Sequence, residues 1–141
     1  MFDYKTRMKE KSVAPNGNKI KALLTVTAIL ESGTGLVLIA LPRLLTTLLF
    51  GSFIDTLVAS TVARVAGVAI FSISLACWIA RHDGHSHAAR GMVSAVLVYN
   101  TAIAIVLVYA ATGLALSGIG LWPVVLMHSA MSAWCIISLL K

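Results

Sequence analysis

The chain has 141 residues, of which 59% are hydrophobic and 11% are charged, and its formal net charge is +6. A soluble domain has about a quarter charged residues, so this composition indicates a membrane protein rather than a soluble domain. In a soluble protein the positive charge would suggest nucleic acid. Here the basic residues flank apolar segments, so they predict orientation in a lipid bilayer and contact with anionic lipid, and no nucleic-acid partner.

Residues 1–21 form a polar, basic N-terminal tail. The sequence Pro15-Asn16-Gly17-Asn18 within it predicts a turn. The part before that turn is expected either to lie on the membrane surface or to be disordered. The tail has no long apolar core, so no cleavable signal is predicted, and the apolar run that follows should remain as an anchor.

Residues 22–141 form the predicted four-span transmembrane domain. Each of its four long runs has about twenty apolar residues or more, which is enough to cross a bilayer as a helix. The runs cover residues 22–41, 57–80, 91–113 and 121–140, and a short run at 44–50 predicts an interfacial or re-entrant segment. The predicted fold class is all-α, an integral membrane four-helix bundle.

The distribution of basic residues predicts the orientation. The tail, the loop 81–90 and Lys141 hold all the Lys and Arg except Arg43 and Arg64. An even number of spans puts these three regions on one side, which is predicted to be the cytoplasm. Both termini are therefore expected to be cytoplasmic, in a multi-pass protein of the inner (plasma) membrane. The cysteines, Cys77 and Cys135, lie inside apolar runs and are expected to be buried packing residues without a disulfide.

Small residues are spaced for close helix packing. Ala59, Ala63 and Gly67 recur every four residues on the second run, and Gly33 and Gly35 lie on the first. Such spacing lets helix backbones approach each other. Packing within one protomer is the favoured interpretation, with a homo-oligomer contact as the alternative.

Each apolar run carries a polar or ionisable side chain near its middle: Glu31, Arg64, the pair Tyr99 and Asn100, and His128. Such residues are costly in a bilayer, so they should face the bundle interior and have partners. Counting about 1.5 Å of helix rise per residue puts them within about one turn of the same depth. Glu31 and Arg64 are the predicted ion pair, and the other three could fill its remaining hydrogen-bond positions.

Two interpretations of these five residues remain open. They could form a dry polar clasp that fixes helix register, as buried polar residues do in coiled coils. They could instead form a site for a proton, an ion or a small polar ligand. If Glu31 is not fully paired in the bilayer, it can act as a proton carrier.

The loop between the second and third runs contains a weaker pattern. His82, Asp83, His85 and His87 are residue types that suit zinc, copper or nickel. Their spacing matches no closed metal site, so a solvated loop without metal is expected. The sequence also has no nucleophile with its base, no phosphate-binding loop and no H-E-x-x-H helix. No catalytic residue and no cofactor are therefore predicted, and an enzyme is not favoured.

Four stretches carry a resemblance: LPRLLTTLLFG, ARVAGVAIFSISLACWIAR, ARGMVSAVLVYNTAIAIVLVYA and LWPVVLMHSAMSAW. Over about residues 41–135 the chain resembles an uncharacterised group of small bacterial four-span inner-membrane proteins. This resemblance implies a compact four-helix protein of that membrane, with no assigned activity. The segment AILESGTG resembles the first helix of small multidrug resistance transporters. Transport activity is not carried over, because this chain is longer than those transporters and has an intramembrane arginine.

Three functions follow from these observations. The first is an accessory or structural membrane subunit, in contact with the lipid bilayer and assembled as a homo-oligomer or within a larger membrane complex. The second is a small transporter or proton-coupled carrier that uses Glu31, Arg64 and His128. The third is a quinone- or lipid-handling membrane protein, in which Tyr99, Asn100 and His128 contact the head group.

Overall fold

The computed structural model describes residues 2–52, 55–84 and 86–140, with the backbone alone over residues 2–16. Within these residues it contains α-helices and no strands. The helices are α1 (Phe2–Ala40), α2 (Pro42–Phe50), α3 (Leu57–Ala80), α4 (His87–Gly113) and α5 (Leu121–Leu139). The all-helical fold class is therefore confirmed.

Four of the helices are long and apolar enough to cross a membrane, namely α3, α4, α5 and the part of α1 from Gly17 onward. Their bounds agree with the predicted spans to within a few residues at most ends. The helix α4 begins at His87 rather than at 91, because Ser86 caps it. The Ser86 hydroxyl accepts a hydrogen bond from the Ala89 N–H at 3.0 Å, which satisfies one of the unpaired donors at a helix start.

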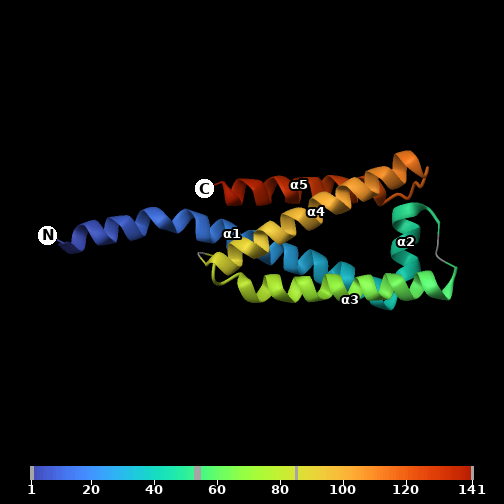
Figure 1. Cartoon of the computed structure of the whole chain (residues 1–141), viewed down its shortest axis with the longest axis horizontal. Coiled ribbons are helices and arrows are strands. Elements are labelled where there is room, and N and C mark those ends of the chain that lie inside the picture. Colours follow the sequence, from blue (N-terminus) through green and yellow to red (C-terminus); the bar gives the residue numbers. More distant parts are fainter. Residues whose placement is uncertain (1, 53–54, 85, 141) are drawn as a thin grey trace.

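The turn predicted at Pro15-Asn16-Gly17-Asn18 is wrong, because α1 passes through these residues as one continuous helix. A proline inside a helix removes one backbone hydrogen bond and can bend the helix, but it does not always end it. The N-terminal part of α1 projects beyond the other helices (Figure 1). Its predicted location on the membrane surface stays a prediction.

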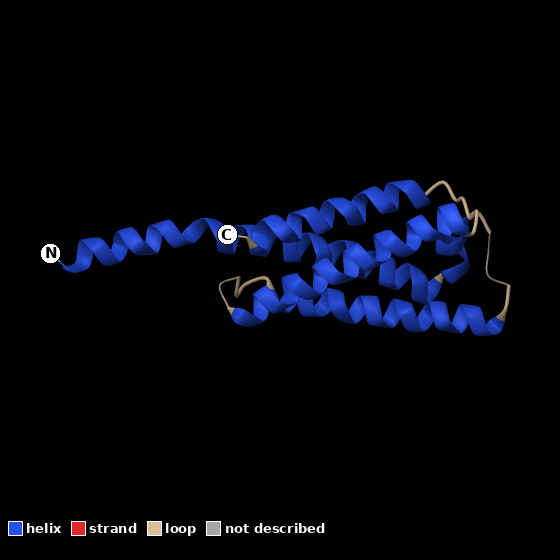
Figure 2. Cartoon of the chain, turned by 45° about the horizontal axis from the view of Figure 1, so that its top comes forward, coloured by secondary structure: helices blue, strands red, loops and turns tan. Residues whose placement is uncertain are grey.

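The long helices form two antiparallel pairs, α1 with α3 and α4 with α5, which run side by side along the bundle (Figures 1 and 2). Packing is extensive within each pair and sparser between the pairs. The main apolar core joins them near one end of the bundle and includes Leu23, Leu24, Cys77, Val93 and Cys135. Both cysteines are free and fully buried there, as predicted.

Two glycines bring α1 and α3 into backbone contact. A Cβ atom added to Gly35 would lie 2.8 Å from the Gly67 carbonyl oxygen, and one added to Gly67 would lie 2.8 Å from the Leu38 Cβ. The predicted small-residue packing within the protomer is therefore confirmed for this pair. It is wrong for Gly33, which is exposed and where an added Cβ would meet nothing within 4 Å.

A second contact fixes the register of α1 against α3. At the far end of the pair, a Cβ added to Gly84 would lie 2.8 Å from the Gly17 carbonyl oxygen. Gly84 lies just after α3. Together with the contact between Gly35 and Gly67, its contact places the two helices in one antiparallel register over the stretch between these two points. Glu31 therefore lies level with Phe71 on α3.

The short helix α2 lies across the other end of the bundle (Figure 1). It ends at Gly51, which has a left-handed backbone with φ of 72°. The Gly118 N–H donates to the Leu49 carbonyl at 3.0 Å, and the Gly120 N–H donates to the Leu48 carbonyl at 2.8 Å. These carbonyls belong to the last turn of α2 and have no donor inside the helix, so the loop before α5 satisfies them. The segment predicted at 44–50 is thus a short helix held at the bundle end.

Candidate functional site

Two adjacent residues on α4 connect this helix to α1 and to α5. The Tyr99 hydroxyl donates a hydrogen bond to the Glu31 carboxylate on α1, with an O–O distance of 3.0 Å. Asn100 is bonded to His128 on α5, with 2.7 Å between the Asn100 Oδ1 and the His128 Nδ1. Consecutive residues on a helix point about 100° apart, so neighbouring positions can reach two different helices. The polar layer formed by these four residues therefore joins α1, α4 and α5.

The hydrogen bonds assign the proton on the histidine. The Asn100 amide nitrogen donates to the Val96 carbonyl at 2.8 Å, which leaves the Asn100 Oδ1 as an acceptor. The His128 Nδ1 must then carry the proton that it donates to Asn100, and in the neutral ring the Nε2 is an acceptor. The His128 ring also packs edge-on against Tyr99, with 5.9 Å between ring centroids and 76° between the planes.

The polar layer is buried. The exposed fractions of Glu31, Asn100 and His128 are 4%, 1% and 5%, and Tyr99 is half-buried. Buried polar groups stabilise a structure only when their hydrogen bonds are made. The structure therefore brings four of the five predicted residues together, and their bonds are made largely to one another.

The predicted ion pair between Glu31 and Arg64 is wrong. Arg64 has an exposed side chain, and its guanidinium donates to the Ile39 carbonyl at 2.9 Å. That carbonyl lies in the last turn of α1, where it has no donor within the helix and where the negative end of the helix dipole attracts a cation. Arg64 therefore caps the end of α1 and is not part of the polar layer.

The depth predicted for Arg64 from the sequence is wrong because α3 extends past the end of α1. The register set by Gly35 and Gly67 puts Arg64 level with Leu38. Leu38 lies seven residues beyond Glu31 on α1, which is about 10 Å along the helix axis. Counting residues from the predicted ends of the spans gave about half that separation, because the count assumed that both spans end at the same depth in the bilayer. Figure 1 shows α3 reaching further than α1 on the side of α2.

The size of the Arg64→Leu effect distinguishes a helix cap from a buried ion pair. We expect Arg64→Leu to lower the free energy of unfolding by about 1 kcal/mol, because one hydrogen bond to a partly exposed carbonyl is lost. Loss of one partner of a buried ion pair would cost about 3–5 kcal/mol. The measurement is equilibrium unfolding in mixed detergent and SDS micelles. Arg43→Leu is the control, because it removes the same charge near the same end of the bundle.

Thr27 lies one helical turn from Glu31 and on the same side of α1. Its side chain is 1% exposed, and its hydroxyl oxygen has no hydrogen-bond partner among the described residues. Thr27 and Glu31 therefore form a buried polar pair of positions on α1. Thr34, about one turn further along α1, is half-buried and donates to the Leu30 carbonyl of its own helix.

Two polar contacts between helices were missed by the sequence analysis. The Thr101 and Ser132 hydroxyls lie 3.2 Å apart and link α4 to α5. The Arg90 guanidinium donates to the Leu139 carbonyl at 3.3 Å and caps the end of α5. The sequence does contain a signal for such caps. The last carbonyls of a helix have no donor within that helix, and an arginine near the end of a neighbouring span can reach them.

The histidine-containing loop forms no metal cluster in the part that the structure describes. His82, Asp83 and His87 are exposed, and no three His, Cys, Asp or Glu side chains of the described residues lie close enough together to hold a metal ion. His85 lies outside the described residues. The prediction that the whole loop is solvated and without metal therefore stays a prediction.

The polar layer combines a carboxyl, a phenol, an amide and an imidazole without a nearby cation among the described residues. These groups can hold helices together, exchange protons, or bind a small polar molecule. No protein-family model, no curated protein and no solved structure matches this chain.

Proposed function

We propose that this protein is an accessory or structural subunit of the inner membrane, in which the polar layer is a clasp between the two helix pairs. The observation that carries this proposal is the mutual hydrogen bonding of Glu31 with Tyr99 and of Asn100 with His128 in a buried layer. The bond between Tyr99 and Glu31 crosses from one helix pair to the other, where helix packing is sparser, and the bond between Asn100 and His128 lies within the pair of α4 and α5. The first bond therefore supplies a specific register between the pairs and the second supports the register within a pair, which is a well-attested role of buried polar side chains.

The connections between the spans support a role inside the bilayer. The loops at 81–86 and 114–120 are short, and the segment 42–50 is a helix held against the bundle. These loops offer little surface for a partner outside the membrane. The long helices expose many large apolar side chains, including Val58, Val65, Val98 and Ile105. In a bilayer such surfaces contact lipid or the helices of a partner.

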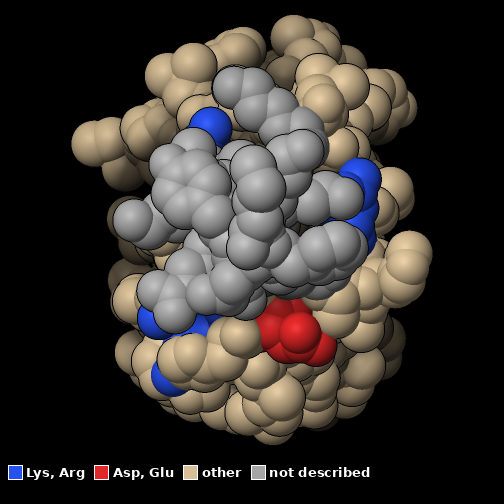
Figure 3. Space-filling view, turned by 90° about the vertical axis from the view of Figure 1, so that its left-hand side faces the viewer, with Lys and Arg blue, Asp and Glu red and all other residues tan. Residues whose placement is uncertain are grey.

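Orientation in the membrane follows from charge. Lys19, Lys21, Arg81 and Arg90 lie at one end of the bundle, called here the basic end, where Gly17 contacts Gly84. Figure 3 looks onto this end and has lysine and arginine side chains around it. We propose that the basic end is cytoplasmic, because Lys and Arg accumulate on that side of membrane proteins.

A tagged copy expressed in its native cells tests the proposed role. The protein is solubilised in a mild detergent and sized by native electrophoresis. We expect a species larger than the detergent-bound monomer, either a homo-oligomer or a complex with other membrane proteins. Consistent recovery of the monomer from several mild detergents would contradict an accessory or structural role.

A proton-coupled carrier is the second candidate, and one observation favours it. Glu31 has a hydroxyl partner rather than a cation in the described residues, and the Thr27 hydroxyl beside it has no partner. Intramembrane ionisable residues of this kind often mark proton paths. Proton uptake into vesicles that contain the protein would support this candidate if Glu31→Gln abolished it. The control is Thr34→Val, since Thr34 bonds only to its own helix.

A quinone- or lipid-handling role for the polar layer has less support. The Tyr99 hydroxyl and the Asn100 side chain, which would contact a quinone head group, are already engaged by Glu31, Val96 and His128. A ligand there would have to displace these bonds. Purified protein that retains a quinone through detergent exchange would favour this third candidate.

A further inference from the structure

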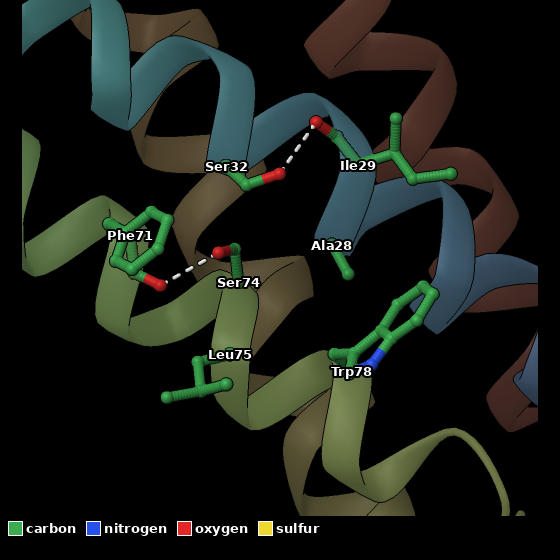
Figure 4. A pocket seen from close by; sticks show the side chains of 7 residues that line it. All are labelled: Ala28, Ile29, Ser32, Phe71, Ser74, Leu75 and Trp78. Carbon is green, nitrogen blue, oxygen red and sulfur yellow. Dashed lines mark hydrogen bonds between the residues drawn. The ribbon is translucent and has the colours of Figure 1, made fainter.

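A groove lies between α1 and α3, and none of its lining residues belongs to the polar layer. It encloses about 360 Å³ and is lined by Ala28, Ile29 and Ser32 of α1 and by Phe71, Leu75 and Trp78 of α3. Figure 4 shows Ala28 and Trp78 close together across the groove, with Phe71 further along α3. From Phe71 to Trp78 the groove follows α3 for about 10 Å, given a rise of 1.5 Å per residue.

The groove is apolar although two serines line it. The Ser32 hydroxyl donates to the Ile29 carbonyl at 3.0 Å, and the Ser74 hydroxyl donates to the Phe71 carbonyl at 2.7 Å. Figure 4 shows both bonds directed to the serine's own helix. Neither hydroxyl therefore needs a polar ligand, and the walls suit a hydrocarbon chain.

Two cations lie where the groove meets the basic end. The Arg81 guanidinium carbon lies 3.3 Å from the centre of the Trp78 ring, and the same guanidinium donates to the Trp78 carbonyl. Stacking on an aromatic ring holds the cation at the end of the groove. Lys21 is exposed, lies level with Arg81 in the register of α1 and α3, and shares the helix face of Ala28 and Ser32 at helical spacing.

We propose that this groove binds an anionic phospholipid. One acyl chain lies in the groove between α1 and α3, and the phosphate head group lies between Lys21 and Arg81. Trp78 sits between the two regions, at the depth where tryptophan is enriched at membrane interfaces. Charge complementarity selects the anionic lipid, since each Lys or Arg near a membrane surface strengthens binding to anionic lipid. Asp83 is exposed at the same end, but no salt bridge joins it to a cation in the described residues.

This site is independent of the proposed role of the polar layer, because the two share no residue. The test uses the full chain with Trp122→Phe and Trp134→Phe, which leaves Trp78 as the single tryptophan. The protein is placed in phosphatidylcholine vesicles that contain increasing amounts of lipid with brominated acyl chains. Bromine quenches tryptophan on contact, so the fluorescence of Trp78 reports occupancy of the groove.

Brominated phosphatidylglycerol should quench Trp78 at a lower mole fraction than brominated phosphatidylcholine does. We expect Lys21→Gln to reduce this preference by roughly fivefold at low salt, the factor expected for one cation near the membrane surface. Lys19→Gln is the matched control. It removes the same charge two residues away, on the opposite face of α1, and should leave the preference unchanged.

Three results would overturn the proposal. One is equal quenching by the two lipids, and another is an unchanged preference in Lys21→Gln. The third is the absence of quenching by either lipid, which would show that a second copy or another protein covers the groove. If the single-tryptophan chain does not fold, retention of phosphatidylglycerol over phosphatidylcholine by the wild-type chain and by Lys21→Gln in native mass spectrometry gives the same comparison.

Discussion

The substitution Gly35→Ile is expected to destabilise the bundle more than any other single change considered for this chain. A Cβ at Gly35 would lie 2.8 Å from the Gly67 carbonyl oxygen and 2.9 Å from the Phe71 backbone nitrogen. Backbone atoms cannot move aside as a flexible side chain can, so α1 and α3 would have to separate. Overpacking of this kind costs about 1–3 kcal/mol or more. Equilibrium unfolding in mixed detergent and SDS micelles measures the loss.

Gly33→Ile is the matched control for this prediction. It makes the same change in helix propensity on the same helix, two residues away, where an added Cβ meets nothing within 4 Å. Its effect on the free energy of unfolding should stay within about 0.5 kcal/mol. Equal destabilisation by both substitutions would mean that the close contact between α1 and α3 is not what Gly35 provides.

The substitution Asn100→Leu is expected to have the second largest effect. It keeps a side chain of similar size but removes the acceptor for the His128 Nδ1–H, which lies 2.7 Å from the Asn100 Oδ1. A buried donor left without a partner costs about 1–3 kcal/mol. Ser94→Ala is the control, because Ser94 is exposed and bonds to the Arg90 carbonyl of its own helix.

The double substitution Asn100→Leu with His128→Leu sharpens this test. Replacing both partners of a hydrogen bond by apolar groups of similar shape can be nearly neutral. The double variant should therefore be more stable than Asn100→Leu alone, measured by the same unfolding transition. If the two changes simply add, His128 does not depend on Asn100 for its buried hydrogen bond.

The sequence was sufficient to predict the four long apolar helices and the burial of most of the polar layer. Long apolar runs determine where helices can span a bilayer, and the cost of a polar group in hydrocarbon determines that Glu31, Asn100 and His128 face inward. Both arguments depend on the residues of a single helix and on the surrounding solvent. They therefore need no knowledge of how the helices are arranged.

The partner of Arg64 could not be predicted in the same way, because it depends on the register between two helices. That register is set by the contact of Gly35 with Gly67 and by how far α3 extends past α1, where α2 and the segment up to residue 56 intervene. An offset of a few residues moves a side chain by a full helical turn. The pairing of opposite charges by type alone therefore led to the wrong partner for Glu31.

The turn predicted before the first span failed for a local reason. The prediction relied on the turn preference of proline, asparagine and glycine, which is a statistical tendency and yields to the helical residues on either side. The continuous helix through Pro15 is the outcome.

A double-mutant cycle between Glu31 and Tyr99 tests most directly whether the polar layer joins the helix pairs. Stability is measured for Glu31→Leu, for Tyr99→Phe and for the double variant, and a second cycle combines Glu31→Leu with Arg64→Leu. Hydrogen bonds between membrane helices give coupling energies of about 0.6 kcal/mol on average and up to about 1.7. We predict a coupling in this range for Glu31 with Tyr99, and none beyond about 0.5 kcal/mol for Glu31 with Arg64. The reverse pattern, with Glu31 coupled to Arg64 and not to Tyr99, would contradict the account.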